Sequence, residues 1–383
     1  MDWAFFKKSL NKMSWVYYIP LFILAFFFFL IMIFKVTTFI DEVRSLGFSY
    51  KVKRQGPVKA RGIYISSWSA SEPKKIKKLV DFVLNTNLNA VVIDIKDVTG
   101  KVSYKTDVDL ARKNHLYELR IKDIKKTINH LKDKGIYVIG RISVFKDDAL
   151  ARRKNNLALQ KQGNIWEDMS NLAWVDPASK IVWDYNIALA KEGLSLGFEE
   201  INFDYIRFPS DGDIANIDYP VWKRKKQKQE IIKSFFKYQH SKLKDHRVSA
   251  DLFGMTMSHV RDGFDMNIGQ RLEDAYGYFG YICPMLYPSY FRNAFSEIKK
   301  PFEKPYEVID KSFKNAQDSL NKLKKDEKPF IRPWIQAFST NQEKIKPDFI
   351  KLQKQAVEDN DSYGFLLWSS KNDYFDFQEV FKN

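Results

Sequence analysis

The chain has 383 residues, of which 45% are hydrophobic and 29% are charged, a composition typical of a globular protein rather than a disordered one. Its 63 Lys and Arg residues exceed its 47 Asp and Glu residues by 16, so the protein is strongly basic. The single cysteine, Cys283, excludes an intramolecular disulfide framework and a cysteine-rich zinc module. The sequence has no HExxH, GxxxxGK(S/T) or GxGxxG string, so neither a bound metal nor a nucleotide cofactor is predicted.

Residues 15–34 form a run of 20 residues without a charged side chain, close to the N-terminus. Twenty helical residues cover about 30 Å, the thickness of the hydrocarbon core of a bilayer. The run is longer than the apolar core of a secretory signal peptide, and no small-residue cleavage site follows it. We therefore predict a transmembrane signal anchor at residues 15–34 after a short cytoplasmic tail at residues 1–14, rather than a buried core helix.

The positive-inside rule does not decide the orientation of this anchor, because lysines lie on both sides of it. A short N-terminal tail followed by a large domain favours a domain outside the cytoplasm. We therefore expect a single-pass protein of the cell membrane with an extracytoplasmic domain. Residues 35–60 are charged and irregular, and we predict that they form a linker.

Short apolar runs, rich in β-branched and aromatic residues, alternate with helical patterns after the linker. The eight runs are residues 62–68, 90–97, 137–145, 200–209, 248–254, 281–288, 331–338 and 364–370. Repeated strand–helix units imply a parallel sheet, and eight of them predict a closed (β/α)8 TIM barrel over residues 61–383. Only 13 residues follow the last run, so the eighth helix must be short or missing. An open doubly wound sheet is the alternative.

Polar residues near the end of each run are the candidates for chemistry, because active sites of such barrels lie at the C-terminal ends of the strands. Alternation in the fourth run places Asn202 and Asp204 on the face opposite its apolar residues, so Asp204 should point into the barrel mouth. Asp251 has a comparable position in the fifth run. Glycoside hydrolysis needs two such carboxyl groups. We predict Asp204 as nucleophile or base and Asp251 as general acid.

Further polar and aromatic residues are predicted to bind the sugar. Alternation in the second run places Asp94 and Lys96 on one face, with Asp97 near its end. The full set of predicted substrate-binding residues is Asp94, Lys96, Asp97, Arg141, Trp166, Arg207, Tyr287, Trp334, Gln336 and Trp368. Trp166 belongs to the long segment 146–175, whose length is typical of a functional loop. Arg141 and Arg207 are expected to hold Asp204 ionised, and burial is expected to raise the pKa of Asp251.

Several alternatives stay open. The acids could simply pair with Arg141 or Arg207 as structural ion pairs, and if Asp251 is not the acid, then Asp94, Asp97 or Glu167 must be. A non-catalytic glycan-binding or envelope scaffold protein would keep the same barrel and cleft. A metal-dependent hydrolase is disfavoured, because none of the five histidines lies late in a strand run. The basic segment 221–228 is either the solvated start of a helix or a contact for an anionic polymer or lipid headgroups. Nucleic acid is not an expected partner.

Several strings carry a family resemblance. They are LAWVDP at 172–177, VWDYNIA at 182–188, FDYIRFPSDG at 203–212, SADLFG at 249–254, PMLYPS at 284–289, PYEV at 305–308, IRPWIQ at 331–336 and LLW at 366–368. With these strings, residues 61–375 resemble a bacterial family named "putative glycosyl hydrolase domain", whose members are often membrane-anchored or secreted.

The resemblance implies a TIM barrel with glycosidase activity, and it does not imply a particular sugar. The position of Asp204 is similar to that of the nucleophile in α-amylase-like and α-galactosidase-like barrels, which is an analogy at the level of the fold. Such relatives take their acid from strand five or six, where Asp251 is the one strong candidate. We therefore expect a membrane-anchored glycoside hydrolase that acts on an envelope or extracellular polysaccharide.

Overall fold

The computed structural model describes residues 56–260, 263–291, 297–324 and 327–382, together with Phe26, Phe28, Phe29, Met32 and Lys35. The chain divides into two units, Met1–Gln55 and Gly56–Asn383. Apart from these five residues, the predicted tail, the predicted anchor and the linker up to residue 55 lie outside the described residues. Among the residues described, no helix is both long enough and apolar enough to span a bilayer.

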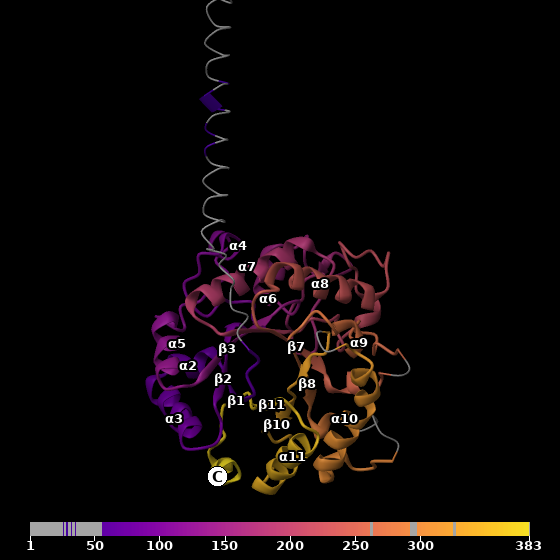
Figure 1. The fold of residues 1–383 in the computed structure, drawn as a ribbon. Coiled ribbons are helices and arrows are strands. Elements are labelled where there is room, and N and C mark those ends of the chain that lie inside the picture. The colour runs from indigo at the N-terminus through magenta and orange to yellow at the C-terminus, as the bar shows by residue number, and fades with distance from the viewer. Residues whose placement is uncertain are drawn as a thin grey trace, which may run out of the picture. The chain divides into compact units, whose positions relative to one another are not determined.

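A closed barrel of parallel strands forms the centre of the second unit (Figure 1). Its described strands are β1 (Ala60–Ile65), β2 (Ala90–Lys96), β3 (Tyr137–Ser143), β6 (Glu200–Asp204), β7 (Val248–Phe253), β8 (Tyr281–Leu286), the split seventh strand β9 (Phe330–Ile331) with β10 (Trp334–Gln336), and β11 (Gly364–Trp368). β1 pairs with both β2 and β11, while β8 pairs with both β9 and β10, so the sheet closes on itself. The structure thus confirms the predicted (β/α)8 barrel and not the alternative, an open doubly wound sheet.

Helices surround this barrel (Figure 1). The long ones are α3 (Pro73–Leu84), α5 (Ile124–Asp133), α7 (Lys180–Leu196), α8 (Lys228–Leu243), α10 (Pro305–Asn321) and α11 (Pro347–Asp359). Short ones are α2 (Ser67–Ser71), α4 (Asp109–Lys113), α6 (Asp148–Arg153) and α9 (Leu272–Ala275), with 3-10 turns η1 (Ile214–Asn216), η2 (Gly254–Met257), η3 (Pro288–Tyr290), η4 (Pro301–Glu303) and η5 (Phe375–Phe381). After β11 only η5 follows in the described chain, as expected from the short C-terminal remainder.

The first strand begins and ends earlier than the apolar run predicted. β1 starts at Ala60 and ends at Ile65, so Trp68 lies in α2 rather than in a strand. The reason is a helix cap: the side chain of Ser66 accepts a hydrogen bond from the backbone N–H of Ser69 at 3.2 Å. Helix α2 therefore begins directly at the C-terminal end of β1, where the mouth of the barrel opens.

Two apolar layers follow from the alternation of side chains along the strands. One layer lies inside the barrel and includes Tyr64, Val92 and Ile139. The other fills the space between strands and helices and includes Ile63 and Val91. Because each strand is covered on both faces, the apolar runs in the sequence are nearly continuous, as is usual for parallel sheets.

An ion pair closes the floor of the barrel, at the N-terminal ends of the strands. Glu200 of β6 and Arg332, which lies between β9 and β10, have wholly buried side chains and pair with each other. The hydroxyl of Tyr137 donates to Oε2 of Glu200 at 3.0 Å, and Arg332 stacks over the ring of Tyr281 with a distance of 4.3 Å to its centroid. This floor leaves the opposite end of the strands as the place for a site.

Candidate active site

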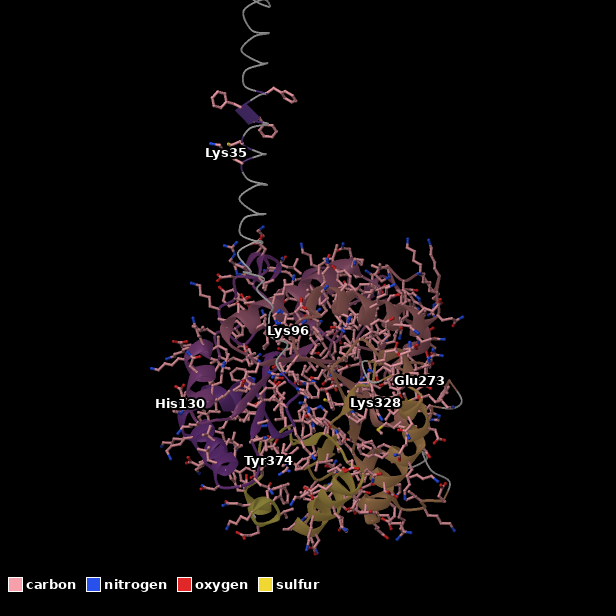
Figure 2. The ribbon with its side chains drawn as sticks, viewed as in Figure 1. Lys35, Lys96, His130, Glu273, Lys328 and Tyr374 are labelled. Carbon is pink, nitrogen blue, oxygen red and sulfur yellow. The ribbon has the colours of Figure 1, made fainter. Side chains whose placement is uncertain are left out.

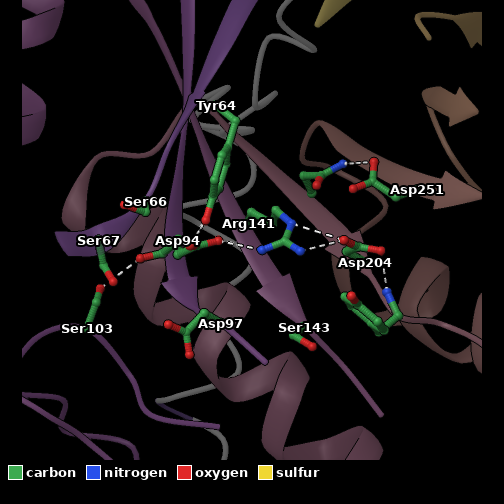
Figure 3. Close-up of polar contacts among 12 residues, drawn as sticks. Tyr64, Ser66, Ser67, Asp94, Asp97, Ser103, Arg141, Ser143, Asp204 and Asp251 are labelled. Atoms are coloured by element: carbon green, nitrogen blue, oxygen red, sulfur yellow. Dashed lines mark hydrogen bonds and ion pairs between the residues drawn. The ribbon is translucent and has the colours of Figure 1, made fainter. Parts of the chain in front are cut away.

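Asp204, the last residue of β6, points into the barrel mouth, as the alternation predicted (Figure 3). Its Oδ2 accepts hydrogen bonds from Nε and Nη2 of Arg141 at 3.1 and 2.6 Å. Its Oδ1 accepts one from the backbone N–H of Tyr205 at 2.6 Å. All three donors are N–H groups, so the side chain serves only as an acceptor in these contacts.

The backbone turns sharply after Asp204. Tyr205 has φ = 52°, in the left-handed region that bulky residues rarely occupy, at a cost of about 1–3 kcal/mol. This turn directs the N–H of Tyr205 back to the carboxylate of Asp204. It also brings the ring of Tyr205 against Trp174, with centroids 5.7 Å apart. Strain of this kind is found at functional sites, where the surrounding structure holds it in place.

A row of buried polar side chains continues from Asp204 across the mouth (Figure 3). Nη1 of Arg141 donates to Oδ1 of Asp94 at 2.6 Å, and the hydroxyl of Tyr64 donates to Oδ2 of Asp94 at 2.5 Å. Burial raises the pKa of Asp94, and the positive charge of Arg141 opposes this effect. Trp368 covers the row, because it stacks on Tyr64 at 4.2 Å and lies 5.1 Å from the guanidinium of Arg141. Arg141 thus fixes two carboxyl groups from two different strands.

Asp251 of β7 has a different environment from Asp204. Its Oδ1 accepts hydrogen bonds from Nδ2 of Asn202 at 2.7 Å and from Nε1 of Trp334 at 2.8 Å. No described residue donates to its Oδ2. Burial, together with the nearby charge of Asp204, raises the pKa of Asp251 well above its usual range, in the direction predicted. A raised pKa keeps a proton on a carboxyl group at higher pH, which is what a general acid requires.

The prediction that Asp94 and Lys96 share a face is wrong. Asp94 pairs with Arg141 and Lys96 pairs with Ile142, the next residue of β3, so Ile95 is an extra residue in β2. Such a β-bulge reverses the alternation. Lys96 consequently lies 4.9 Å from the ring of Tyr185 on α7 and pairs with Asp147. It lies deep among the side chains of the barrel wall (Figure 2) and does not line the mouth.

Asp97 lies at the rim of the mouth in a separate ion pair. Its Oδ2 bonds to Arg120, and its Oδ1 accepts the backbone N–H of Thr99 at 3.0 Å. The guanidinium of Arg120 in turn lies 4.5 Å from the ring of Trp68, which is 56% exposed. Both oxygens of Asp97 are therefore engaged away from Asp204.

Two further predicted sugar contacts are occupied by structural bonds. Trp166 is 2% exposed, and its Nε1 donates to the backbone oxygen of Asp213 at 3.0 Å inside the long loop. Gln336 is wholly buried and donates to Ser289 Oγ at 2.8 Å and to the backbone oxygen of Phe338 at 2.9 Å. Neither side chain is therefore positioned to contact a sugar. Their positions depend on loop packing, which alternation along a strand does not predict.

Aromatic residues from the last strands do lie around the two acids. Trp334 bonds to Asp251 and meets Trp368 edge to face, with centroids 5.5 Å apart. Tyr287 lies close enough for the charges of Asp251 and Asp204 to act on it, and burial is the main cause of its raised pKa. Trp368 is only partly buried and remains a candidate for contact with a sugar ring, together with Tyr287. Trp334 is 1% exposed, so it supports Asp251 rather than contacting a sugar.

Arg207 does not hold Asp204, contrary to the prediction. Its Nη1 donates to the backbone oxygen of Phe208 at 2.9 Å and to Ser210 Oγ at 3.2 Å, and Arg141 alone forms the ion pair with Asp204. The reason is the left-handed turn at Tyr205, after which the chain no longer follows the line of β6.

Some residues of the site were not in the predicted set. Tyr64 bonds to Asp94, and Asn202 bonds to Asp251. Both lie at strand positions whose side chains point into the barrel, so the alternation could have identified them. Gln270 had no such signal because it lies in an irregular segment. It accepts from the backbone N–H of Phe253 at 2.9 Å and donates to the backbone oxygen of Ile206 at 3.3 Å. It thus ties together the chain ends that follow β6 and β7.

Within the described residues, no group of three or more His, Cys, Asp and Glu side chains is arranged to hold a metal ion. The basic segment 221–228 precedes and enters α8, where Arg224 lies 5.4 Å from the ring of Tyr219 and 5.7 Å from that of Trp222. Residues 223–227 are exposed. Their position fits a solvated helix start and leaves them accessible to an anionic partner.

Solved structures share this fold at low sequence identity. The glycoside hydrolase domain of PgaB (BpsB) from Bordetella bronchiseptica has a TM-score of 0.60 and 11% identity, covering 85% of this chain and 99% of that chain. The α-galactosidase TtGalA from Thermus thermophilus has a TM-score of 0.51 and 9% identity, covering 86% of this chain and 62% of that chain. At these identities the likeness supports the barrel fold alone.

A third solved structure, the curated proteins and the family models complete the comparisons. A hypothetical protein from Ruminiclostridium thermocellum is 35% identical, with a TM-score of 0.46, covering 49% of this chain and 96% of that chain. No curated protein matches the chain. A family described as "Putative glycosyl hydrolase domain" matches residues 62–374.

Proposed function

Because the chain belongs to this family of glycosyl hydrolase domains, we propose that it cleaves a polysaccharide with Asp204 as nucleophile or base and Asp251 as general acid. The observation that carries this proposal is the unequal environment of two carboxyl groups on neighbouring strands. Asp204 accepts three N–H groups, whereas Asp251 is buried, has a raised pKa and keeps Oδ2 without a donor. Pairs of acids with such different surroundings are typical of acid–base assignments in hydrolases.

The chemistry assigns one step to each acid. Asp251 gives its proton to the glycosidic oxygen as the bond from that oxygen to the anomeric carbon breaks. Asp204 either attacks the anomeric carbon or takes a proton from the attacking water. Carboxyl groups about 5–5.5 Å apart would give retention of configuration, and a separation of about 6.5–9.5 Å would give inversion.

The substrate and the location are parts of the same proposal. An envelope or extracellular polysaccharide fits a barrel anchored by residues 15–34 with its mouth outside the cytoplasm, and the support for that anchor is the charge-free run in the sequence. Tyr287 and Trp368 would present aromatic surfaces to the sugar rings. The basic character of the chain would favour anionic polymers or lipid headgroups as neighbours.

The test uses purified full-length protein in mild detergent and its Asp204→Asn variant. Both are incubated with cell-envelope and exopolysaccharide fractions, and newly formed reducing ends are measured. We expect Asp204→Asn to lose at least about 10³-fold in turnover with an unchanged circular dichroism spectrum. Asp109→Asn, a substitution at an exposed helix position, is the matched control and should keep full activity.

Turnover of Asp204→Asn within tenfold of the wild type would contradict the catalytic role of Asp204. Sugar binding without release of reducing ends by either protein would favour the glycan-binding alternative.

A further inference from the structure

Arg207 is a buried cation without an ion-pair partner in the described part of the chain. It is 6% exposed and lies between three aromatic rings, with centroids 5.0 Å away for Trp174, 5.3 Å for Tyr205 and 4.6 Å for Phe253. Only Nη1 is engaged, with the backbone oxygen of Phe208 and Ser210 Oγ. Nε and Nη2 donate to no described residue. Neither of these two nitrogens is fully enclosed, so both keep some contact with solvent.

Arg207 differs from Arg141, the other buried arginine of the mouth, in its charged neighbours. Burial acts to lower the pKa of both arginines. At Arg141 the charges of Asp204 and Asp94 overcome this effect, and the pKa is raised. At Arg207 the neighbouring charges do not overcome it, and the pKa is lowered. A buried charge is normally paired, because an unpaired charge loses its hydration without a partner to compensate for it.

The buried acids of the mouth already bond to other cations or are kept neutral. Arg141 bonds to Asp204 and Asp94, and Lys146 pairs with Asp168 at 2.6 Å. Burial favours the neutral form of Asp251. Asp204, Asp168 and Asp211 act on Arg207 through space, but none of them bonds to it. No described acid therefore forms an ion pair with Arg207, and an anion bound beside it would be its first such partner.

We propose that Arg207 binds an oxyanion carried by the substrate, either a carboxylate or a phosphate, so that the substrate is an acidic polysaccharide. The planar guanidinium can direct Nε and Nη2 together at two oxygens of such a group. The three rings fix its plane and keep competing water from one side. This inference rests on the proposed function, and it agrees with the excess of 16 positive charges, which attracts anionic polymers over long distances.

The experiment compares native and neutralised substrates. Full-length wild type, Arg207→Gln and Arg207→Lys are assayed for reducing-end release from an acidic envelope polysaccharide. The same polymer is then assayed after chemical reduction of its carboxyl groups and, separately, after removal of its phosphates with hydrofluoric acid. Arg247→Gln is the matched control, because Arg247 also lies over an aromatic ring, that of Tyr137, and donates to a backbone oxygen, but it precedes β7 at the floor of the barrel.

We expect Arg207→Gln to raise KM for the native polymer at least about tenfold, since it removes charge-assisted hydrogen bonds. One of the two neutralising treatments should raise the KM of the wild type to the value that Arg207→Gln shows for the native polymer, and it should leave the KM of Arg207→Gln unchanged. The treatment that has this effect identifies the group bound by Arg207 as a carboxylate or a phosphate. Arg207→Lys should be intermediate, and Arg247→Gln should behave as wild type. Equal losses on native and neutralised polymers would overturn the proposal and leave Arg207 as a support for the loop.

A binding measurement separates this inference from the proposed function. Galacturonic acid, galactose and inorganic phosphate are titrated calorimetrically into wild type and Arg207→Gln. In one outcome the wild type binds galacturonic acid or phosphate at least about tenfold more tightly than Arg207→Gln does, while neither protein cleaves a polymer. This result would support the anion site and contradict the proposed hydrolysis. Cleavage of a polymer, with equal binding of all three probes by the two proteins, would support hydrolysis and contradict the anion site.

Discussion

The floor and the mouth of the barrel both contain buried acids, arginines and a tyrosine, but they are arranged differently. At the floor Glu200 meets Arg332, and Tyr137 donates to the same acid. At the mouth one arginine bonds to two of three acids, and a second arginine bonds to none. A closed pair supports a fold, whereas unmatched charges in a mouth leave groups for a substrate. Substitutions at the floor should therefore lower stability and leave turnover unchanged, whereas substitutions at the mouth should mainly lower turnover.

The largest expected effect concerns the acid of the mouth. Asp251→Asn should lower turnover of the polysaccharide by about 10²–10⁴-fold, because the leaving oxygen loses its proton donor. An aryl glycoside with a good leaving group needs no such donor, so its turnover should fall far less. Comparison of kcat for the two substrates checks this. An equal fall for both would show that Asp251 has another role.

The floor should respond in stability alone. Arg332→Met leaves Glu200 buried without its partner and should cost about 3–5 kcal/mol of the free energy of unfolding. Turnover of the remaining folded protein should not change, since Arg332 pairs with Glu200 and bonds to neither Asp204 nor Asp251. Urea unfolding and active-site titration measure the two quantities. A fall in turnover per folded molecule would contradict this separation.

The pH dependence of stability gives a smaller contrast. The pKa of Asp251 is raised in the folded protein, so the folded state holds a proton that the unfolded state has lost. Stability should therefore fall as pH rises from about 4, the pKa of an unfolded Asp, to the raised pKa of Asp251. Asp251→Asn can still accept from Asn202 and Trp334, and it should remove this fall. Thermal unfolding of both proteins between pH 4 and 8 tests it, and parallel curves would refute the assignment.

The smallest effect comes from removing one hydroxyl at each end. Tyr64→Phe takes the donor from Asp94, and Tyr137→Phe takes it from Glu200. Each should cost about 1 kcal/mol in stability. Only Tyr64→Phe should also lower kcat, by up to about tenfold, because Asp94 positions Arg141 against Asp204. An unchanged kcat in Tyr64→Phe would limit the role of Asp94 to structure.

Alternation along a strand predicts side-chain positions only where the strand is regular. The alternation of β6 predicted the inward position of Asp204 correctly, because regular strand geometry fixes the side on which each residue points. The same rule failed at Lys96, where one extra residue at Ile95 reverses the faces. It gave no information for Trp166 or Arg207, which lie outside the strands, or for the bonds of Gln336, the last residue of β10, to residues beyond the strands.

The sequence by itself determined the order of strands and helices, the closed barrel and the inward position of the two central acids. These features depend on periodicity and on parallel pairing, which are local or nearly local properties of the chain. Only the tertiary structure decided which arginine holds which acid. That choice depends on the left-handed turn at Tyr205, after which Arg207 bonds to the backbone oxygen of Phe208, while Arg141 of the sequence-distant strand β3 bonds to Asp204.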